Sequence, residues 1–480
     1  MIDPPKQKES YFEAQGNKKT IPTKTETLYA NAADVRVRKN IDDLTIEELG
    51  NYIHAMDILK KQPSGKNYNY FAELHNSASV GPCEHARDSF LPWHRAHLLA
   101  FENALRASDP PRTAKVTVPY WNWSELPSGS RYAKAFETEE ILKDRRRYTT
   151  PICKTAGQGQ CDPLSYPWEY LNTQVLNVKA WSSTGSDNFG GISNEEIFCD
   201  DRLDGAYGSL EAPAHNGMHS RYIGGFMSSP STAARDPIFW SFHAFIDVLW
   251  YNWQTREGHK VDTCLECQLC FKAWANDGIY VKVSEYVDSH AQSTDGVNVS
   301  YDFTPPSILV ASQKEPFILA HNAWNGSTDL VDEKTVSVTI PANPVENAVV
   351  EIEDMVNASP ISYQINAYLY PADGVEWNPA SLEFRSNYMV YLNSIWRAHE
   401  GHQHKGKSTQ TFRIDLAEEL NHLQEQHAGE NWVLRILTAK EPELPPETVE
   451  ALDTIMLGAP PSNVNVDEAL KIGEIKLSIN

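Results

Sequence analysis

The stretch DPIFWSFHAFIDVLW, residues 236–250, decides the fold of this chain. Asp236 and Pro237 form a helix N-cap and first-turn pair, and Ile246 and Leu249 follow at helical spacing. The stretch therefore predicts a helix that begins at Asp236-Pro237 and carries His243. By itself, such a histidine is more often a hydrogen-bonded core or surface residue than a metal ligand.

Two further histidines lie upstream on another predicted helix. His215 and His219 stand four residues apart in the sequence His215-Asn216-Gly217-Met218-His219. On a helix this spacing places both rings on one face, where they can hold one ion. An HxxxH pair is common in proteins, but His243 follows 24 residues later and can supply a third imidazole.

A similar set of three histidines comes earlier in the chain. His94 lies in the sequence FLPWHR, residues 90–95, where Pro92 fits the first turn of a helix. His85 precedes it by nine residues in a loop, and His75 lies at the end of a helix predicted over 68–75. Two such sets are much harder to obtain by chance than any single histidine.

Six neutral imidazoles without a carboxylate favour a pair of borderline-soft metal ions, and copper above all. Zinc is the rival metal. A catalytic zinc site, however, usually holds one ion with three protein ligands and water, often including a carboxylate. Two matched sets of three histidines therefore predict a dinuclear copper site, which can hold dioxygen between its ions.

These segments resemble the copper A and copper B regions of the type 3 copper proteins, which are tyrosinases, catechol oxidases and molluscan haemocyanins. The likeness covers roughly residues 35 to 255 and is specific at its motifs, which are 37–45, 90–95, 118–123, 215–219 and 236–247. It implies that two copper ions are bound, the first by His75, His85 and His94 and the second by His215, His219 and His243. His54 is the alternative to His75, which the resemblance favours because Phe71-Ala72-Glu73-Leu74-His75 precedes the loop to Cys83.

The resemblance also implies roles for residues beside the ligands. Some family members join a cysteine two residues before the second copper A ligand to that histidine as a thioether, and Cys83-Glu84-His85 has this spacing; the alternative is a plain buried thiol. Glu211 and Asn216 correspond to a glutamate and an asparagine that together hold a water, which takes the phenolic proton. Alternatively, Glu211 is a helix-entry acid and Asn216 a polar surface residue.

Asp247 falls one helical turn after His243 and is expected to hydrogen-bond a ligand ring or an arginine, with Arg95 and Arg221 as candidate partners. The small side chains of residues 227–231 predict an open entrance beside the copper B site. His97, one turn beyond His94, is expected to face outward.

The resemblance implies an oxidoreductase that uses dioxygen to hydroxylate monophenols and to oxidise o-diphenols to o-quinones. Alternatives are an enzyme restricted to catechols or o-aminophenols, and a haemocyanin-like oxygen-binding protein. Related enzymes are often latent until a C-terminal domain is displaced, and residues 306–480 are the candidate for that part. Small phenols are the expected partners.

Patterning divides the chain near residue 305. Residues 1–40 are polar and predict an N-terminal arm, and 41–305 predict an α-helical bundle domain that holds the dinuclear copper site. After 305 short alternating segments predict an antiparallel, β-sandwich-like C-terminal domain. The capping-box pair Thr45 and Glu48 marks the first helix.

The formal net charge of −22 repels nucleic acids and anionic membranes, so neither is an expected partner. The first residues show no apolar signal segment, which favours a cytoplasmic location and leaves secretion of a processed form open. The sequence does not indicate the oligomeric state. The cysteines other than Cys83 are either thiols or disulfides, namely Cys153, Cys161, Cys199, Cys264, Cys267 and Cys270.

Two further clusters contain residues that often bind metals. His259 with Cys264, Cys267 and Cys270 could form a zinc site, although disulfides or free thiols are the favoured interpretation. Residues 399–404 contain His399, His402 and His404, and a solvated loop is the favoured interpretation there.

Overall fold

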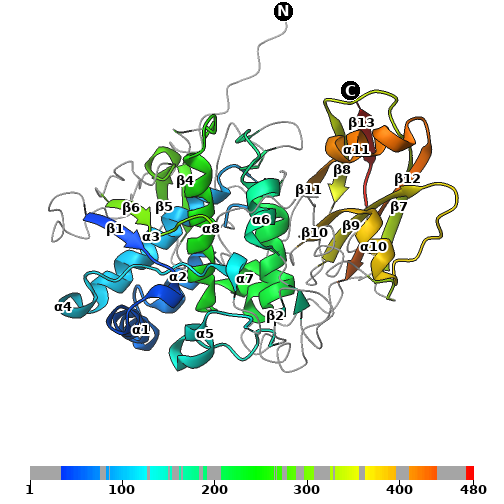
Figure 1. Cartoon of the computed structure of the whole chain (residues 1–480). Helices are drawn as coiled ribbons and strands as arrows, with labels where there is room; N and C mark the ends of the chain where they lie inside the picture. Colours follow the sequence, from blue (N-terminus) through cyan, green and yellow to red (C-terminus); the bar gives the residue numbers. More distant parts are fainter. Residues whose placement is uncertain are drawn as a thin grey trace, which may run out of the picture.

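A computed structural model gives the fold of the chain. It describes residues 34–75, 83–85, 87–126, 130–149, 152–153, 162–163, 166–182, 188–191, 207–263, 265, 268–272, 278–287, 297–306, 325–327, 330–355, 363–395, 410–440 and 472–479. Figure 1 shows a helical part, which contains α1 to α8, beside a part made mainly of strands, which contains β7 to β13.

The helical part is built around α3 and α8, which contact each other. Its α-helices are α1 (Ile46–Lys61), α2 (Tyr68–His75), α3 (Phe90–Ser108), α4 (Pro110–Thr113), α5 (Lys134–Thr138), α6 (Trp168–Tyr170), α7 (Pro230–Ala233) and α8 (Ile238–Gln254). Its 3-10 helices are η1 (Ile41–Asp43), η2 (Trp123–Glu125), η3 (Glu140–Leu142), η7 (Gly225–Ser228) and η8 (Val283–Glu285). Among the described residues it also has three π-helices: η4 (Leu171–Val175), η5 (Leu210–His215) and η6 (Met218–Ile223).

Two helix starts predicted from the sequence are found with small differences. The side chain of Thr45 accepts from the amide of Glu48 and the Glu48 side chain accepts from the Thr45 amide, so the capping box is confirmed. The helix predicted from Asp236-Pro237 begins at Ile238, and Pro237 is its N-cap. Asp236 still accepts from the Ile238 amide at 3.0 Å, which satisfies one of the donors at the helix start.

The prediction of a polar arm up to residue 40 is wrong for its last residues. Residues Asp34–Arg38 form β1, which pairs in parallel with β6 (Val297–Tyr301). Arg36 and Arg38 are buried on this strand, while Val35 and Val37 are exposed. The strand therefore directs its charged residues into the helical part and belongs to the fold. Residues 1–33 lie outside the described residues.

The prediction of strands in the C-terminal part is confirmed. One sheet has the order β10-β9-β12-β7 and the other β11-β8-β13, with antiparallel pairing throughout. The strands are β7 (Leu330–Thr339), β8 (Ala348–Met355), β9 (Tyr363–Pro371), β10 (Met389–Ile395), β11 (Gln410–Asp415), β12 (Asn431–Lys440) and β13 (Ile475–Ile479), and the helices are α10 (Leu382–Tyr388) and α11 (Ala417–His427). Short two-stranded pairs elsewhere are β2 (Ile152–Cys153) with β3 (Asp162–Pro163) and β4 (Gln268–Lys272) with β5 (Gly278–Lys282).

The described residues form separate hydrophobic cores in the two parts. Buried residues between Ile41 and Val299 make one core, and both C-terminal sheets contribute to a second core between Val338 and Ile472. The two parts meet where β10 contacts η5, and where the rings of Tyr207 and Phe412 lie 5.5 Å apart.

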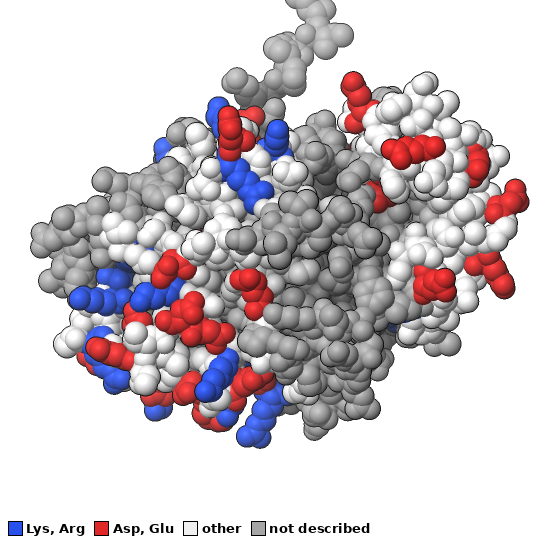
Figure 2. Space-filling model, viewed as in Figure 1, with Lys and Arg blue, Asp and Glu red and all other residues white. Residues whose placement is uncertain are grey.

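Acidic side chains predominate on the strand-rich part in the view of Figure 2, whereas both signs are interspersed over the helical part. This distribution agrees with the formal net charge of −22. Among the helices that the structure describes, none combines the length and apolarity needed to cross a membrane.

Candidate dinuclear metal centre

Six buried or half-buried histidines converge in the helical part. His75 ends α2, His94 lies in the second turn of α3, and His243 lies in the second turn of α8. His85 comes from the loop before α3, and His215 and His219 come from η5 and η6. The core packing of α2, α3 and α8 thus brings together side chains that are up to 168 residues apart in sequence.

The histidines of the second set lie closest together. The Nε2 atom of His243 is 3.4 Å from Nε2 of His215 and 3.3 Å from Nε2 of His219. The candidate ligand atoms of these three residues all lie within 4.8 Å of one another. Three imidazole nitrogens converging at this separation can bind a single metal ion.

The first set is more open and adjoins the second. The ring centroids of His75, His85 and His94 lie between 5.4 and 5.8 Å apart. The ligand atoms of His75 and His94 lie within 4.8 Å of each other and of His243, whose ring stacks on that of His94 with centroids 4.3 Å apart. The sets therefore share a boundary at His243, which is the arrangement expected of a dinuclear centre.

Hydrogen bonds to the second ring nitrogen orient three of these rings. Nδ1 of His75 donates to the carbonyl of Pro230 at 2.7 Å, Nδ1 of His94 to Phe90 at 2.8 Å, and Nδ1 of His219 to Met227 at 2.9 Å. A carbonyl only accepts, so the proton is on Nδ1 and the Nε2 lone pair is the one that can bind a metal.

Burial keeps the rings of His94, His215, His219 and His243 neutral, which is the form that binds metal. Removal from water lowers the pKa of His215 to about 3 and holds the pKa values of His94, His219 and His243 well below the ordinary range. Neighbouring imidazoles lower the pKa of His94, His219 and His243 further. Nε2 of His94 is buried without a hydrogen-bond partner among the described residues, and a bound metal ion would satisfy it.

The donor set fits copper, because all six candidate ligands are imidazoles. His54, the alternative to His75, lies apart from these groups: its Nε2 contacts Oδ2 of Asp109 at 2.9 Å. His75 is fully buried among the rings. The geometry therefore favours His75 over His54 as the third member of the first set.

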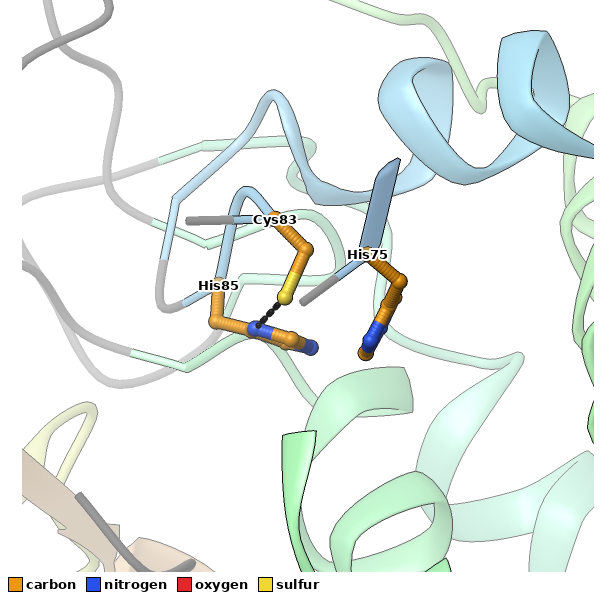
Figure 3. A group of neighbouring side chains, drawn as sticks. All are labelled: His75, Cys83 and His85. Atoms are coloured by element: carbon orange, nitrogen blue, oxygen red, sulfur yellow. Dashed lines mark hydrogen bonds between the residues drawn. The ribbon is translucent and has the colours of Figure 1, made fainter. Parts of the chain in front are cut away.

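Cys83 lies directly beside the first set. Its Sγ is 3.1 Å from Nδ1 of His85, and the His85 ring extends toward His75 (Figure 3). Burial, followed by the charges of Glu84 and Glu211, raises the pKa of the Cys83 thiol well above its ordinary value. Cys83 is a buried thiol in this structure. The side chains of the other cysteines lie outside the described residues, so the disulfide and zinc hypotheses do too.

Glu211 and Asn216 flank His215 and are both buried. Oδ1 of Asn216 accepts from Nδ1 of His215 at 2.9 Å. This contact orients the Asn216 amide, whose Nδ2 has no hydrogen-bond partner among the described residues. Asn216 is therefore not a surface residue, and its amide group can donate to a small polar molecule.

The helix predicted for His215 and His219 differs from an ordinary α-helix. Both residues lie in π-helical turns, and Ala212 inside η5 has extended backbone angles. Gly217 between them lies against Tyr166, since a Cβ there would be 2.0 Å from the tyrosine hydroxyl oxygen. Only glycine permits this close approach. Single π turns are frequent at functional sites.

Asp247 belongs to a buried ion network that the sequence revealed only in part. It accepts from Nε of Arg95 at 2.7 Å, from Arg38 at 3.1 Å, and from the Tyr301 hydroxyl. Arg38 also donates to Glu102 at 3.0 Å. The network ties α3 to α8 beside His94 and His243. The side chain of Arg221, the other candidate partner, lies outside the described residues.

Two sequence expectations about the surroundings are wrong. His97 does not face outward: it is 1% exposed. Residues 227–231 do not form an open entrance, because all five are buried and the carbonyls of Met227 and Pro230 bind His219 and His75. Small size in this stretch therefore allows close packing against the ligands. His259 packs its ring on Trp253, and residues 396–409 lie outside the described residues.

Comparison with known proteins agrees with this site. Residues 65–256 match the family model for the common central domain of tyrosinase. The tyrosinase of Streptomyces glaucescens is 32% identical over 237 residues, which is 46% of this chain and 83% of that protein.

Two solved structures share the fold over nearly the whole chain. A latent aurone synthase, a polyphenol oxidase, has a TM-score of 0.63 and 18% identity over 94% of this chain and 90% of that one. A latent apple tyrosinase has a TM-score of 0.62 and 17% identity over 94% and 98%. The convergent histidines and these matches together show that the chain is a member of the tyrosinase family of type 3 copper proteins.

Proposed function

We propose that the chain is a copper-dependent oxidoreductase that uses dioxygen to hydroxylate monophenols and to oxidise o-diphenols to o-quinones. The observation that carries the proposal is the convergence of His75, His94, His215 and His219 around His243, with His85 beside His75. His75, His85 and His94 would hold one copper ion and His215, His219 and His243 the other. When bound, the copper pair would supply the binding and reduction of dioxygen.

Activity on monophenols needs a proton acceptor, because phenols have a pKa near 10 and are protonated at neutral pH. Glu211 is buried on η5, the helical turn that ends at His215, and its carboxylate can accept a proton. The Asn216 amide, held by His215, can donate to a water whose proton points to Glu211. Such a water would take the phenolic proton and leave a phenolate, which is the reacting form of the substrate.

Replacing Glu211 with glutamine is expected to depress monophenol turnover about tenfold or more relative to catechol turnover, since general-base catalysis contributes about 10²–10⁴-fold. The amide keeps the shape of the side chain but cannot accept the proton. Initial rates of oxygen consumption on a monophenol and on its catechol measure the ratio. Equal losses on both substrates would contradict the water-holding role, and the proposal would then be reduced to a catechol or o-aminophenol oxidase.

We also propose that Cys83 and His85 form a thioether in the mature protein. A bond from Sγ to a ring carbon would replace one S–H and one C–H bond, and dioxygen at the copper pair would accept the two electrons and two protons released. Support comes from the 3.1 Å approach of Sγ to the His85 ring and from the burial of the thiol. The cross-link would fix one ligand ring and limit its movement during turnover.

The thioether predicts an intact mass about two units below that of the sequence, because two hydrogens are lost, and a Cys83 that resists alkylation after denaturation and reduction. A Cys83→Ser variant serves as the control, since it should show no mass deficit. Recovery of Cys83 as an alkylated peptide from copper-loaded protein would refute the cross-link.

The contact between β10 and η5 supports latency, because η5 carries Glu211 and His215. We propose that a domain beginning near residue 306 restricts access to the site. Limited proteolysis near residue 305 should raise oxygen consumption on catechol severalfold. An unchanged rate with the C-terminal part removed would contradict latency. Reversible oxygen binding without consumption, before and after cleavage, would instead indicate an oxygen carrier.

A further inference from the structure

His97 is a buried histidine that the proposed copper ligation does not use. It lies one turn after His94 on α3, and its ring packs between Trp93 at 5.0 Å and Trp240 at 4.8 Å from centroid to centroid. Only 1% of it is exposed, and burial lowers its pKa to about 4. A neutral imidazole in so apolar a place is costly unless its polar atoms are hydrogen-bonded.

The hydrogen bond of His97 reaches the helix that carries His75. Its Nε2 lies 2.8 Å from the carbonyl oxygen of Phe71, and since a carbonyl only accepts, Nε2 is the protonated donor. Phe71 stands four residues before His75, one turn from the end of α2. In an α-helix this carbonyl is the one that faces the amide of His75. The hydrogen bond from His97 therefore holds the helical turn that positions the His75 ring.

Side-chain hydrogen bonds hold α2 near both of its ends, in addition to the bond of His75 to Pro230. At its start, the Tyr68 hydroxyl lies 3.2 Å from the carbonyls of Ala234 and Arg235, and Nε1 of Trp240 donates to it. At its end, His97 binds Phe71, and the rings of His97 and His75 are nearly parallel with centroids 6.2 Å apart. His97 also lies on the same helix as His94, so it links two members of the first set.

We propose that His97 is a positioning residue for the first copper ion: it fixes the last turn of α2 against α3, so that His75 and His94 are held at the separation that one ion requires. The inference rests on the proposed copper centre. It predicts that loss of the Nε2 donor weakens the first copper site selectively, by about 10- to 100-fold in affinity, as for other groups that orient metal ligands. The second site has its own three ligands and should keep its ion.

The test is copper retention by the full chain against increasing concentrations of a competing chelator, together with the melting temperature of the metal-free and copper-loaded protein. His97→Phe keeps an aromatic ring and removes the donor. His97→Gln restores an N–H donor at the place of Nε2. His54→Phe is the matched control, because His54 also has its Nε2 in a hydrogen bond but lies apart from the site.

We expect wild type and His54→Phe to keep two ions per chain at a chelator concentration that leaves His97→Phe with one, and His97→Gln to recover most of the loss. Copper should also raise the melting temperature of His97→Phe less than that of wild type. If His97→Phe does not fold, His97→Gln is compared with His97→Asn. Only the longer glutamine amide reaches the Phe71 carbonyl, so the asparagine variant should lose the first ion and the glutamine variant should keep it.

Two results would overturn the inference. If His97→Phe binds two ions with wild-type affinity, His97 does not position the first site. If the melting temperature of His97→Phe falls below that of wild type by the same amount in the metal-free and the copper-loaded form, His97 has a merely structural role. The chelator series on wild type tests the proposed function separately. Wild-type protein that binds no copper would overturn that function itself.

Discussion

Replacement of His243 by asparagine is expected to remove one copper ion per chain and to lower oxygen-consuming activity by more than about a hundredfold. Loss of a group that only orients a ligand already costs about 10–100-fold in metal affinity or activity. His243 is itself a candidate ligand, its Nε2 lies within 3.4 Å of both His215 and His219, and its ring stacks on His94. The change should therefore disturb both halves of the centre.

Copper content by elemental analysis and initial rates on catechol measure this effect. His54→Asn is the control, since it removes a histidine of the helical part that contacts Asp109. The control should keep two ions and the wild-type rate. A His243→Asn variant that keeps two tightly bound ions and normal turnover would show that His243 is not a ligand of the centre.

Replacement of Asp247 by alanine should destabilise the helical part by about 3–5 kcal/mol, the cost of breaking a buried ion pair and leaving its partners uncompensated. Arg38 and Arg95 are at most 2% exposed and both donate to this carboxylate. Without it, Arg38 would keep Glu102, whereas Arg95 would keep only neutral acceptors among its described partners.

Urea unfolding followed by tryptophan fluorescence measures this loss, because many of the buried tryptophans lie in the helical core. Asp57→Ala is the matched control: Asp57 also lies on a helix and pairs with a lysine, Lys61, but at the surface. We expect the control to change stability by at most about 0.5 kcal/mol. Similar losses of unfolding free energy in the two variants would show that the buried network stabilises the fold no more than a surface ion pair does.

The histidine sets could be predicted from the sequence because each lies in a short local pattern. His94 comes two residues after Pro92, which fits a first helical turn, and His215 and His219 have helical spacing. Such patterns depend only on neighbours along the chain. The approach of α3 to α8, which stacks His94 on His243, is a tertiary contact that no local pattern contains.

The prediction from the sequence failed where charged residues are buried and apolar residues are exposed, which is the reverse of the usual pattern. In β1 the valines at 35 and 37 are exposed, and the arginines at 36 and 38 are buried. Alternation predicts a strand but assigns the apolar side to the core. Here the buried side of the strand faces the carboxylates of Glu102 and Asp247, which lie on helices distant in the sequence. The partners that invert the pattern cannot be read from the strand itself.

The error on His97 has a related cause. An outward face was expected one turn beyond His94, yet residues 90–99 of α3 are all buried. A helix buried on all sides has no solvent face, so periodicity cannot assign one. The π turns around His215 and His219 were not predicted either, and the close approach of Gly217 to Tyr166 between them is a tertiary contact that no local pattern contains.

Anomalous X-ray scattering at the copper edge, recorded from crystals of the copper-loaded chain, tests most directly whether six imidazoles enclose two ions. We expect two peaks, one among His75, His85 and His94 and one among His215, His219 and His243. A single peak, or one with any of these rings turned away from it, would contradict the assignment of a dinuclear centre.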